Sequence, residues 1–491
     1  MGLQTATDYG LLRRLASYIY NAVPKDNNKV CCVDKTGWQE NGSVYLMPDN
    51  TIIGEATEKY AFQSASNVVH HSSRRGTHEE WKTQVASLCQ GNSRLTFVVS
   101  VSFACGLLGI INAEGGGFNL FGRSSGGKTT ALNMAASVMG RPKNYILRWR
   151  STDNGLEGTA KLHNDSLLIL DELGEMDSSK AGQCAYMLAN GGGKIRSNTS
   201  GNARPTAEWL LMFLSSAEIT LAEHMAESGK AARAGQETRF ADLPADAGKG
   251  MGIFENIHGY DSPGKFADGI KQITEQCHGT AFPAFIEAVI SKGSGELQNS
   301  IRLFKEAFLD KYVPNNVSGQ IYRVASRFAL VAAAGEFATE NGITGWEKGE
   351  AEVAVAACFM AWLNNRSHTE DQEDVRIVAV FKGYFQQYGE SRFFSARYNN
   401  KGVLEVVENF RTPQRVDGFK IVKKNQIEFY VFPQSFNEIS KGLNQSSTIK
   451  FLAENGYTVR DSHGRNQPQK RLPNGYGQSR IYHFTSKILT D

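Results

Sequence analysis

The segment FNLFGRSSGGKTTALNMAASVMG (118–140) decides the fold of this chain. An apolar run leads into GRSSGGKT (122–129), and a helix-like run that ends at Gly140 follows. This matches the pattern G-x-x-x-x-G-K-[ST] in the strand–loop–helix context of a phosphate-binding P-loop. Glycines let backbone N–H groups turn toward phosphate oxygens, and the helix N-terminus adds a partial positive charge. The candidate ATP-binding residues are Gly122, Ser124, Ser125, Gly126, Gly127, Lys128, Thr129 and Thr130.

A second motif is SLLILDE (166–172), whose Asp171 lies 43 residues after Lys128. Its apolar run predicts a buried strand that delivers Asp171 and Glu172 to the carboxyl edge of a sheet, where ligands bind in open α/β folds. Lys128 would reach the β- and γ-phosphates, and Thr129 and Asp171 would hold Mg²⁺. Glu172 would polarise the attacking water as a general base. The predicted cofactors are therefore ATP and Mg²⁺.

Strand-like and helix-like runs alternate around these motifs. Four of the five strand-like runs lack strict polar–apolar alternation, which indicates strands buried on both faces of a parallel sheet. We therefore predict an α/β fold with a five-stranded parallel sheet between helices. The expected strands are 118–122, 145–149, 167–171, 210–215 and 239–244, and the expected helices between them are 129–140, 155–163 and 181–190. A helical run over 81–112 is expected to end at the glycines 115–117.

The chain divides by composition into four expected domains. These are a small N-terminal α+β module (1–88), an ATPase core (89–280), an Ala-rich helical lid (281–366) and a basic winged-helix-like domain (367–491). Residues 376–491 carry 18 Lys+Arg against 9 Asp+Glu, whereas the whole chain has a net charge of only +3. Helices combined with a basic hairpin are typical of a nucleic-acid-binding winged helix.

Composition excludes several classes of protein. The chain has 491 residues, of which 41% are apolar and 21% charged, so it can bury a core and is not intrinsically disordered. None of its seven cysteines forms a Cys-x-x-Cys pair, which favours a reducing, cytoplasmic location over a disulfide framework. The most apolar stretch, 97–111, is too short to span a bilayer, so we expect no membrane segment.

Three further groups are candidates for sensing the bound nucleotide. Ser215 and Ser216 end the fourth expected strand, where they would either contact the γ-phosphate or cap a helix. Arg239 precedes the fifth strand and is the preferred arginine finger, a residue that stabilises the transition state in a neighbouring subunit; Arg233 is the competing candidate. Arg323 and Arg327 lie at i and i+4 on one helix face, so one of them acts as a lid sensor or both form solvated ion pairs.

Long phrases of the sequence resemble one family of AAA+ ATPases. They include RSTDNGLEGTAKLHNDSLLILDELGEMD (150–177), AYMLANGGGKIRSN (185–198) and the finger-like TRF (238–240), beside the P-loop segment. Together they are similar to the MCM-like replicative helicases of mobile genetic elements, catalogued as domain of unknown function 927. The resemblance implies a hexameric ring, ATP sites at subunit junctions with Arg239 acting in trans, and movement on DNA. That family commonly has Asn as its sensor, where this chain has Ser215 and Ser216.

The resemblance also implies a DNA-gripping hairpin. The connector NGGGKIRSNTSGNARP (190–205) is glycine-rich and cationic, and its candidate DNA-binding residues are Lys194, Arg196 and Arg204. Cationic tips suit phosphate contacts, which carry affinity without reading sequence; the alternative is a solvated surface hairpin. In the basic C-terminal region, the candidates for phosphate contacts are Arg465, Lys470, Arg471 and Arg480.

These patterns favour an ATP-dependent DNA helicase or translocase that binds single-stranded or forked DNA as a homo-oligomer, expected to be a hexamer. The alternative is an ATP-switched origin-binding initiator or DNA clamp without processive unwinding. A remodeller of protein substrates would need a hydrophobic pore loop, and the connector 190–205 lacks aromatic residues.

Overall fold

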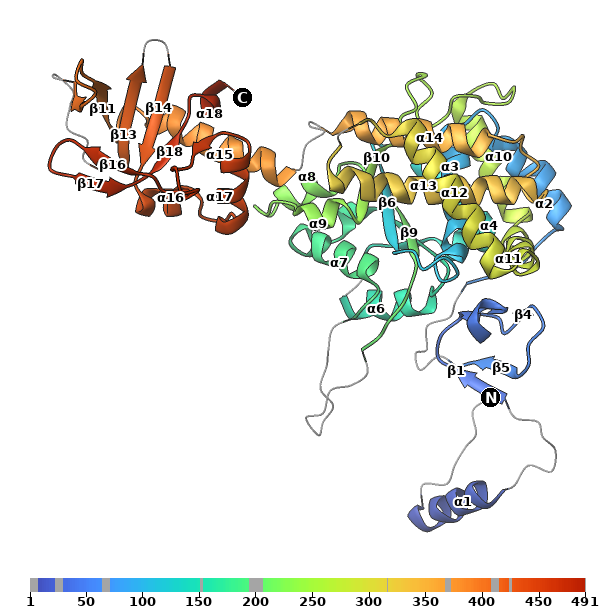
Figure 1. Cartoon of the computed structure of the whole chain (residues 1–491). Helices are drawn as coiled ribbons and strands as arrows, with labels where there is room; N and C mark the ends of the chain where they lie inside the picture. Colours follow the sequence, from blue (N-terminus) through green and yellow to red (C-terminus); the bar gives the residue numbers. More distant parts are fainter. Residues whose placement is uncertain are drawn as a thin grey trace. The chain divides into compact units, whose positions relative to one another are not determined.

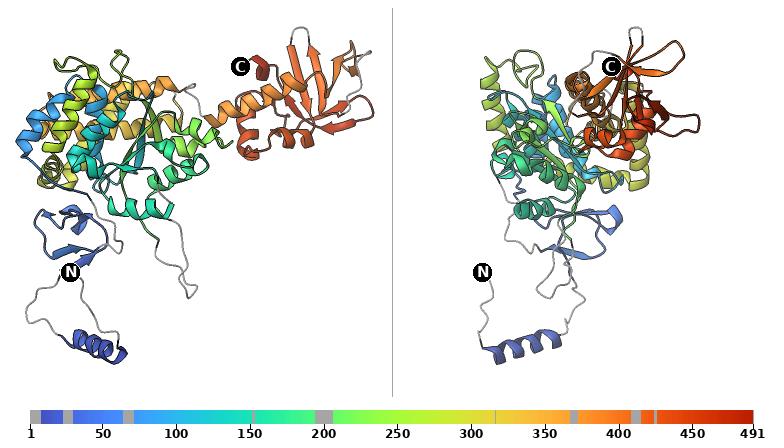
Figure 2. Two further views of the ribbon diagram at one scale, coloured as in Figure 1. Left: turned by 180° about the vertical axis from the view of Figure 1, so that it is seen from behind. Right: turned by 90° about the vertical axis from the view of Figure 1, so that its left-hand side faces the viewer.

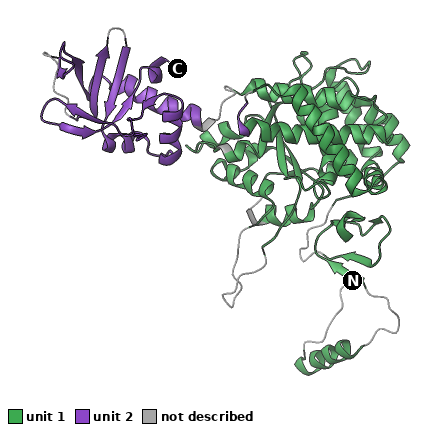
Figure 3. Ribbon diagram, in the orientation of Figure 1, with its two compact units in different colours: residues 1–316, 320–366 green, residues 317–319, 367–491 purple. Residues whose placement is uncertain are grey.

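The computed structural model divides the chain into two compact units (Figures 1 and 3). Unit 1 comprises residues 1–316 and 320–366, and unit 2 comprises residues 317–319 and 367–491. The structure describes residues 8–22, 30–63, 71–150, 153–193, 206–315, 317–366, 372–407, 415–423 and 426–490.

A five-stranded sheet forms the centre of unit 1, and every pair of neighbouring strands is parallel. Its spatial order is β10-β6-β9-β8-β7. The strands are β6 (Gly116–Phe121), β7 (Leu147–Arg148), β8 (Leu167–Asp171), β9 (Met212–Ala217) and β10 (Phe240–Pro244). The predicted mixed α/β fold with a five-stranded parallel sheet is therefore confirmed.

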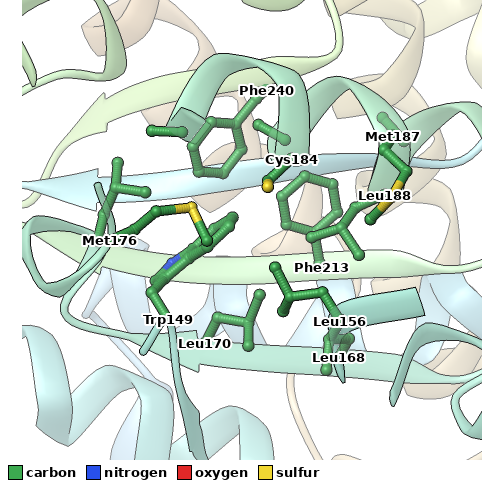
Figure 4. Packing of buried hydrophobic residues seen from close by; sticks show 14 of the residues in the cluster. Trp149, Leu156, Leu168, Leu170, Met176, Cys184, Met187, Leu188, Phe213 and Phe240 are labelled. Carbon is green, nitrogen blue, oxygen red and sulfur yellow. The ribbon is translucent and has the colours of Figure 1, made fainter. Parts of the chain in front are cut away.

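Helices lie on both faces of this sheet (Figure 2). Helices α3 (Ser93–Ala104) and α4 (Lys128–Met139) pack together and against the strands, and α6 (Asp153–Leu162) and α7 (Ser178–Asn190) also pack together. Figure 4 shows the apolar core beneath α6 and α7, in which the rings of Trp149, Phe213 and Phe240 meet. The Phe213 and Phe240 rings stack with their centroids 5.0 Å apart.

The glycines 115–117 do not separate a helix from a strand as predicted; β6 already begins at Gly116. The reason is close packing, because a Cβ on Gly116 would lie 2.3 Å from Cζ of Arg327. A Cβ on Gly117 would lie 2.3 Å from the Phe213 ring. The neighbours of the strand occupy the space that side chains would need.

The predicted single helical run over 81–112 is wrong. The structure has α2 (His78–Gln84), a 3-10 turn at Ala86–Cys89, α3 and a second 3-10 turn at Cys105–Leu107. Asn92 lies at the break before α3, and its side-chain oxygen accepts hydrogen bonds from the backbone N–H groups of Glu255 (2.8 Å) and Asn256 (3.0 Å). The break therefore serves as an anchor for a distant segment.

The N-terminal part of unit 1 is hydrogen-bonded to the sheet domain. It contains α1 (Tyr9–Asn21), the parallel pair β1 (Val30–Val33) and β5 (Lys59–Phe62), and a three-stranded sheet of β2 (Gly37–Gln39), β3 (Val44–Leu46) and β4 (Ile52–Ile53). The Tyr45 hydroxyl donates to the Asp165 carbonyl (2.8 Å), and Trp38 Nε1 donates to the Gly106 carbonyl (2.9 Å).

The helical region of unit 1 packs directly on the sheet domain. Phe328 of α13 lies 5.0 Å, centroid to centroid, from Phe118 of β6 and 5.5 Å from Phe97 of α3. The role of this region as a lid stays a prediction. Its helices are α11 (Ala281–Lys292), α12 (Ser294–Tyr312), α13 (Gly319–Glu340) and α14 (Glu350–Asn365); α5 (Pro142–Tyr145), α8 (Leu221–Ala226), α9 (Ala234–Glu237) and α10 (Pro263–Gln276) complete the unit.

Unit 2 is built on a six-stranded mixed sheet that the sequence did not predict, in the order β12-β11-β13-β14-β18-β15. Aromatic residues of α15 and α16 pack against it: Phe385 stacks on Phe429 (4.2 Å) and Phe436 on Tyr482 (3.9 Å). The winged-helix interpretation stays a prediction. The elements are α15 (Gln372–Tyr388), β11 (Phe393–Tyr398), β12 (Leu404–Val406), β13 (Gly418–Lys423), β14 (Gln426–Val431), α16 (Pro433–Ile439), α17 (Gln445–Glu454), β15 (Thr458–Val459), β16 (Gln469–Leu472), β17 (Gly477–Arg480), β18 (Tyr482–Phe484) and α18 (Lys487–Thr490).

Across the described ranges of both units, no helix combines the length and the apolar character that crossing a bilayer requires.

A buried carboxyl group, Asp242 of β10, gives the fold a testable pH dependence. It accepts hydrogen bonds from Asn119 Nδ2 (2.6 Å) and from the Leu221 backbone N–H (3.1 Å), and burial raises its pKa to about 7. The native state therefore holds this proton more tightly than the unfolded state, so stability falls as pH rises from about 4 to about 7. Asp242→Asn keeps the hydrogen-bond acceptor and removes the titration.

We expect the melting temperature of Asp242→Asn, measured by circular dichroism, to rise relative to the native chain between about pH 4 and about pH 7. The exposed Asp268→Asn serves as the matched control and should track the native chain. A constant difference between Asp242→Asn and the native chain across this range would contradict the prediction.

Candidate nucleotide-binding site

The loop 122–127 connects the carboxyl end of β6 to the first turn of α4. Gly122, Ser125 and Gly127 have positive φ angles (150°, 61° and 87°). A Cβ at Gly127 would meet Cγ2 of Ile253 at 2.5 Å, and the Ile253 backbone N–H donates to the Gly126 carbonyl (3.0 Å). The loop is therefore held from outside by the segment around Ile253, and its turns suit a phosphate cradle.

Lys128, the first residue of α4, lies over this loop. Its Nζ donates to the carbonyls of Gly122 (2.7 Å) and Arg123 (2.8 Å). Burial lowers the pKa of Lys128, while the negative charges of Glu218, Glu172 and Asp171 oppose that shift. Lys128 is therefore close enough to the two predicted catalytic carboxylates to interact with them electrostatically. Thr129 is exposed in the first turn of α4, Thr130 is buried, and Ser124 and Ser125 are exposed on the loop.

Ser216 connects the Asp171 carboxylate to the backbone of Glu172. Its hydroxyl donates to Oδ1 of Asp171, and its oxygen accepts a hydrogen bond from the Glu172 backbone N–H (3.1 Å). Glu172 has φ 64° and ψ 68°, a left-handed conformation that costs roughly 1–2 kcal/mol in a residue with a side chain. The serine therefore stabilises a strained backbone at the position where the general base is predicted.

Ser215, the neighbouring residue on β9, has a different role. Its hydroxyl accepts a hydrogen bond from Trp149 Nε1 (2.8 Å) within the core of Figure 4. Successive residues of a strand point to opposite faces, so only one of the two serines can reach the carboxylates. The structure assigns that position to Ser216.

A cavity of about 530 Å³ opens beside Glu172 at the same edge of the sheet. Sequence reasoning missed two charged residues that line it, Arg148 at the end of β7 and Glu218 directly after β9. Arg148 forms an ion pair with Glu175. The signal that could have found both residues is their position at the carboxyl ends of strands, the same signal that identified Asp171.

The predicted arginine finger, Arg239, and the predicted lid sensor, Arg323, lie at the opposite edge of the sheet. Arg239 and Arg323 line one cavity of about 270 Å³, next to the residues that precede β6 and β10. Arg239 donates to the Gly235 carbonyl (3.2 Å), and its guanidinium carbon lies 4.8 Å from the centroid of the Tyr186 ring. Arg323 therefore does not lie at the P-loop of its own chain, where a lid sensor acting in cis would lie. Arg233 is exposed and does not line this cavity.

Arg327, one helical turn after Arg323, is buried rather than solvated. Its guanidinium donates to the carbonyls of Thr238 (3.0 Å) and Gly115 (3.4 Å), and burial lowers its pKa to about 10. It therefore connects α13 to the residues before β6 and β10. Lys305 of α12 also lines the cavity, and sequence reasoning missed it because it belongs to no motif.

The predicted DNA-gripping residues Lys194, Arg196 and Arg204 lie outside the described residues. The segments that flank them pair with each other: Gly193 N–H donates to the Ala207 carbonyl (2.8 Å), and Trp209 N–H donates to the Gly191 carbonyl (2.9 Å).

Comparison with known proteins supports the fold. A family model described as "Domain of unknown function (DUF927)" matches residues 1–208, less than half of the chain. A solved structure described as "SCCmec type IV Cch - active helicase" is similar with a TM-score of 0.68 and 15% identity; the match covers 98% of this chain and 84% of that one. At this identity the likeness establishes a shared fold. No curated protein has a sequence that matches this chain.

The two serines of β9 provide a matched pair of variants. Ser216→Ala removes the link between Asp171 and Glu172, so we expect the kcat for ATP hydrolysis to fall about tenfold or more, equivalent to ~1.4 kcal/mol. Ser215→Ala leaves Trp149 Nε1 without its partner, so we expect a loss of about 1–3 kcal/mol in the free energy of unfolding. Steady-state phosphate release and urea unfolding measure the two effects. Equal losses of kcat in both variants would contradict this assignment.

Proposed function

We propose that this chain is an ATP-dependent DNA helicase or translocase that works as a ring of identical subunits, expected to be a hexamer. The observation that carries the proposal is the division of charge between the two edges of one parallel sheet. Lys128, Asp171 and Glu172 lie at the carboxyl edge, and Arg239 and Arg323 lie at the amino edge.

Within one subunit, the loop 122–127 would hold the phosphates of ATP through its backbone N–H groups, with Lys128 as the point charge. Thr129 and Asp171 would hold Mg²⁺, which supplies charge neutralisation when it is bound. Ser216 would keep Asp171 and Glu172 in position, and Glu172 would orient and deprotonate the attacking water. The hydroxyl, carboxylate and ammonium groups that this chemistry needs are all present at the carboxyl edge of the sheet.

The arginines would act on the nucleotide of the next subunit. β6 has six residues, so its two ends are about 20 Å apart, and a cation at the amino edge lies beyond the reach of its own P-loop. Head-to-tail contacts in a cyclic oligomer bring the amino edge of one copy against the carboxyl edge of the next. Arg239 and Arg323 would then stabilise the transition-state charge in trans.

DNA is the proposed polymeric substrate. Support comes from the cationic connector with Lys194, Arg196 and Arg204 and from the net charge of +9 over residues 376–491. The solved structure that shares this fold is described as an active helicase, which is consistent with this assignment.

Strand displacement on a forked duplex tests the proposal directly. We expect the full chain to unwind the fork with Mg-ATP and Lys128→Ala to lose at least 100-fold in rate, since the charge on the phosphates is removed. The exposed Lys143→Ala controls for the loss of a surface lysine. If the native chain protects one DNA site from cleavage in an ATP-dependent manner without displacing a strand, it is an initiator or clamp, and the helicase proposal fails.

Mixing two inactive variants tests the action in trans. Lys128→Ala and Arg239→Ala should each hydrolyse ATP poorly, and a 1:1 mixture of subunits should recover about one quarter of native activity. The reason is that about one junction in four then draws both its lysine and its arginine from intact copies. Arg233→Ala in place of Arg239→Ala is the matched control. No recovery in the mixture, measured as phosphate release, would contradict the action of Arg239 in trans.

A further inference from the structure

The ribbon formed by β16 and β17 is a two-stranded antiparallel hairpin in unit 2 (Figure 1). Its tip is a tight turn: the Tyr476 backbone N–H donates to the Pro473 carbonyl (3.3 Å), and Asn474 and Gly475 both have positive φ angles (57° and 81°). Asn-Gly with these angles forms the type I′ turn that matches the twist of paired strands. The turn therefore fixes the register of the ribbon.

One face of the ribbon packs on the six-stranded sheet. Leu472 is buried in an apolar cluster with Phe394, Phe419 and Tyr430 of that sheet. The Tyr476 ring stacks on Phe432 with centroids 5.1 Å apart. These contacts fix one side of the ribbon against the sheet and leave its other face exposed.

The exposed face carries two arginines and two glutamines. In the observed register Gln469 pairs with Arg480, and Arg471 pairs with Gln478. Directly opposed residues of an antiparallel pair point to the same face, and so do residues two positions apart, so these four side chains share one face. All four are exposed, whereas Lys470 alternates with them and lies on the face of Leu472.

Among the residues that the structure describes, these four side chains have no competing partners. Over the described part of the chain, no side-chain hydrogen bond or ion pair involves Gln469, Arg471, Gln478 or Arg480. No aspartate or glutamate occurs from Ser462 to Thr490, so the ribbon has no acidic residue of its own. Two guanidinium groups and two amides are thus presented to solvent with their hydrogen-bonding capacity free.

We propose that the outer face of the β16–β17 ribbon binds in the major groove of B-form duplex DNA and reads base edges there. The major groove admits a two-stranded ribbon. Arginine pairs bidentately with guanine O6 and N7, and glutamine pairs with adenine N6 and N7, so Arg471, Arg480, Gln469 and Gln478 carry the two side-chain types suited to purine edges. This site is separate from the nucleotide site and goes beyond the proposed helicase activity.

Other nucleic acids fit this face less well. Proteins that bind single strands stack bases on exposed aromatic rings. The four exposed side chains of the outer face include no aromatic residue, and the Tyr476 ring at the turn is 37% exposed but stacks on Phe432. A-form RNA duplexes have a major groove too deep and narrow for side chains to read. Duplex DNA is therefore the ligand that matches the shape and chemistry of the ribbon.

Selection of binding sites by the full chain tests the inference. We expect the native chain to enrich one sequence from a pool of random duplexes. Arg471→Ala and Arg480→Ala should each weaken binding to that duplex about 5- to 100-fold, measured by fluorescence anisotropy. Both variants should also discriminate less between the enriched duplex and a scrambled one, because a base contact is lost. Lys470→Ala removes the same charge from the inner face and is the matched control, with an expected loss below about threefold.

Several results would overturn the inference. The pool could show no enriched sequence, or Lys470→Ala could lose as much affinity as the arginine variants. An arginine variant could weaken binding to all sequences uniformly. A single strand or an RNA duplex could also compete effectively with the enriched DNA duplex. Unchanged melting temperatures confirm that the variants are folded. Because the selection is carried out without ATP, it gives its answer whether or not the chain hydrolyses ATP.

Discussion

The parallel pairing of β6 with both β9 and β10 is the constraint on which the candidate nucleotide site depends. Strands that run in the same direction bring their carboxyl ends to one edge, so the P-loop after β6 meets Asp171 at the end of β8 and Ser216 near the end of β9. The same pairing brings the residues before β6 and β10 together at the other edge, and there Arg239 shares a cavity with Arg323. One topological fact therefore explains both groups of charged residues.

Local signals were sufficient to predict the sheet and its motifs. Adjacent residues are enough to recognise the five apolar runs, the glycine-rich loop and the carboxylates after a buried strand. The structure has a strand in each predicted region. The distinction between Ser215 and Ser216 could not be predicted, since it depends on which face of β9 meets Trp149 and which meets Asp171. Likewise, the crowding at Gly116 comes from Arg327, more than 200 residues away.

The sheet of unit 2 was missed for a related reason. β14 pairs with β13 through a short connection, but its other neighbour, β18, lies some 50 residues further along the chain, and β15 is only two residues long. A strand-like pattern in the sequence does not show which distant segment is its partner, so the pairing of β14 with β18 could not be predicted from it. The Asn474-Gly475 turn was available as a local signal, and it marks the hairpin whose register separates Lys470 from Arg471.

Arg327 connects helix α13 to the amino edge of the sheet. Its guanidinium donates to the carbonyl of Thr238, the residue immediately before Arg239, and it fills the space beside Gly116. Arg327 therefore ties the position of α13 to the backbone immediately before Arg239, at the end of the sheet opposite the P-loop. In the proposed ring, substitutions along α13 would therefore act on the arginine offered to the neighbouring subunit and not on the P-loop of their own chain.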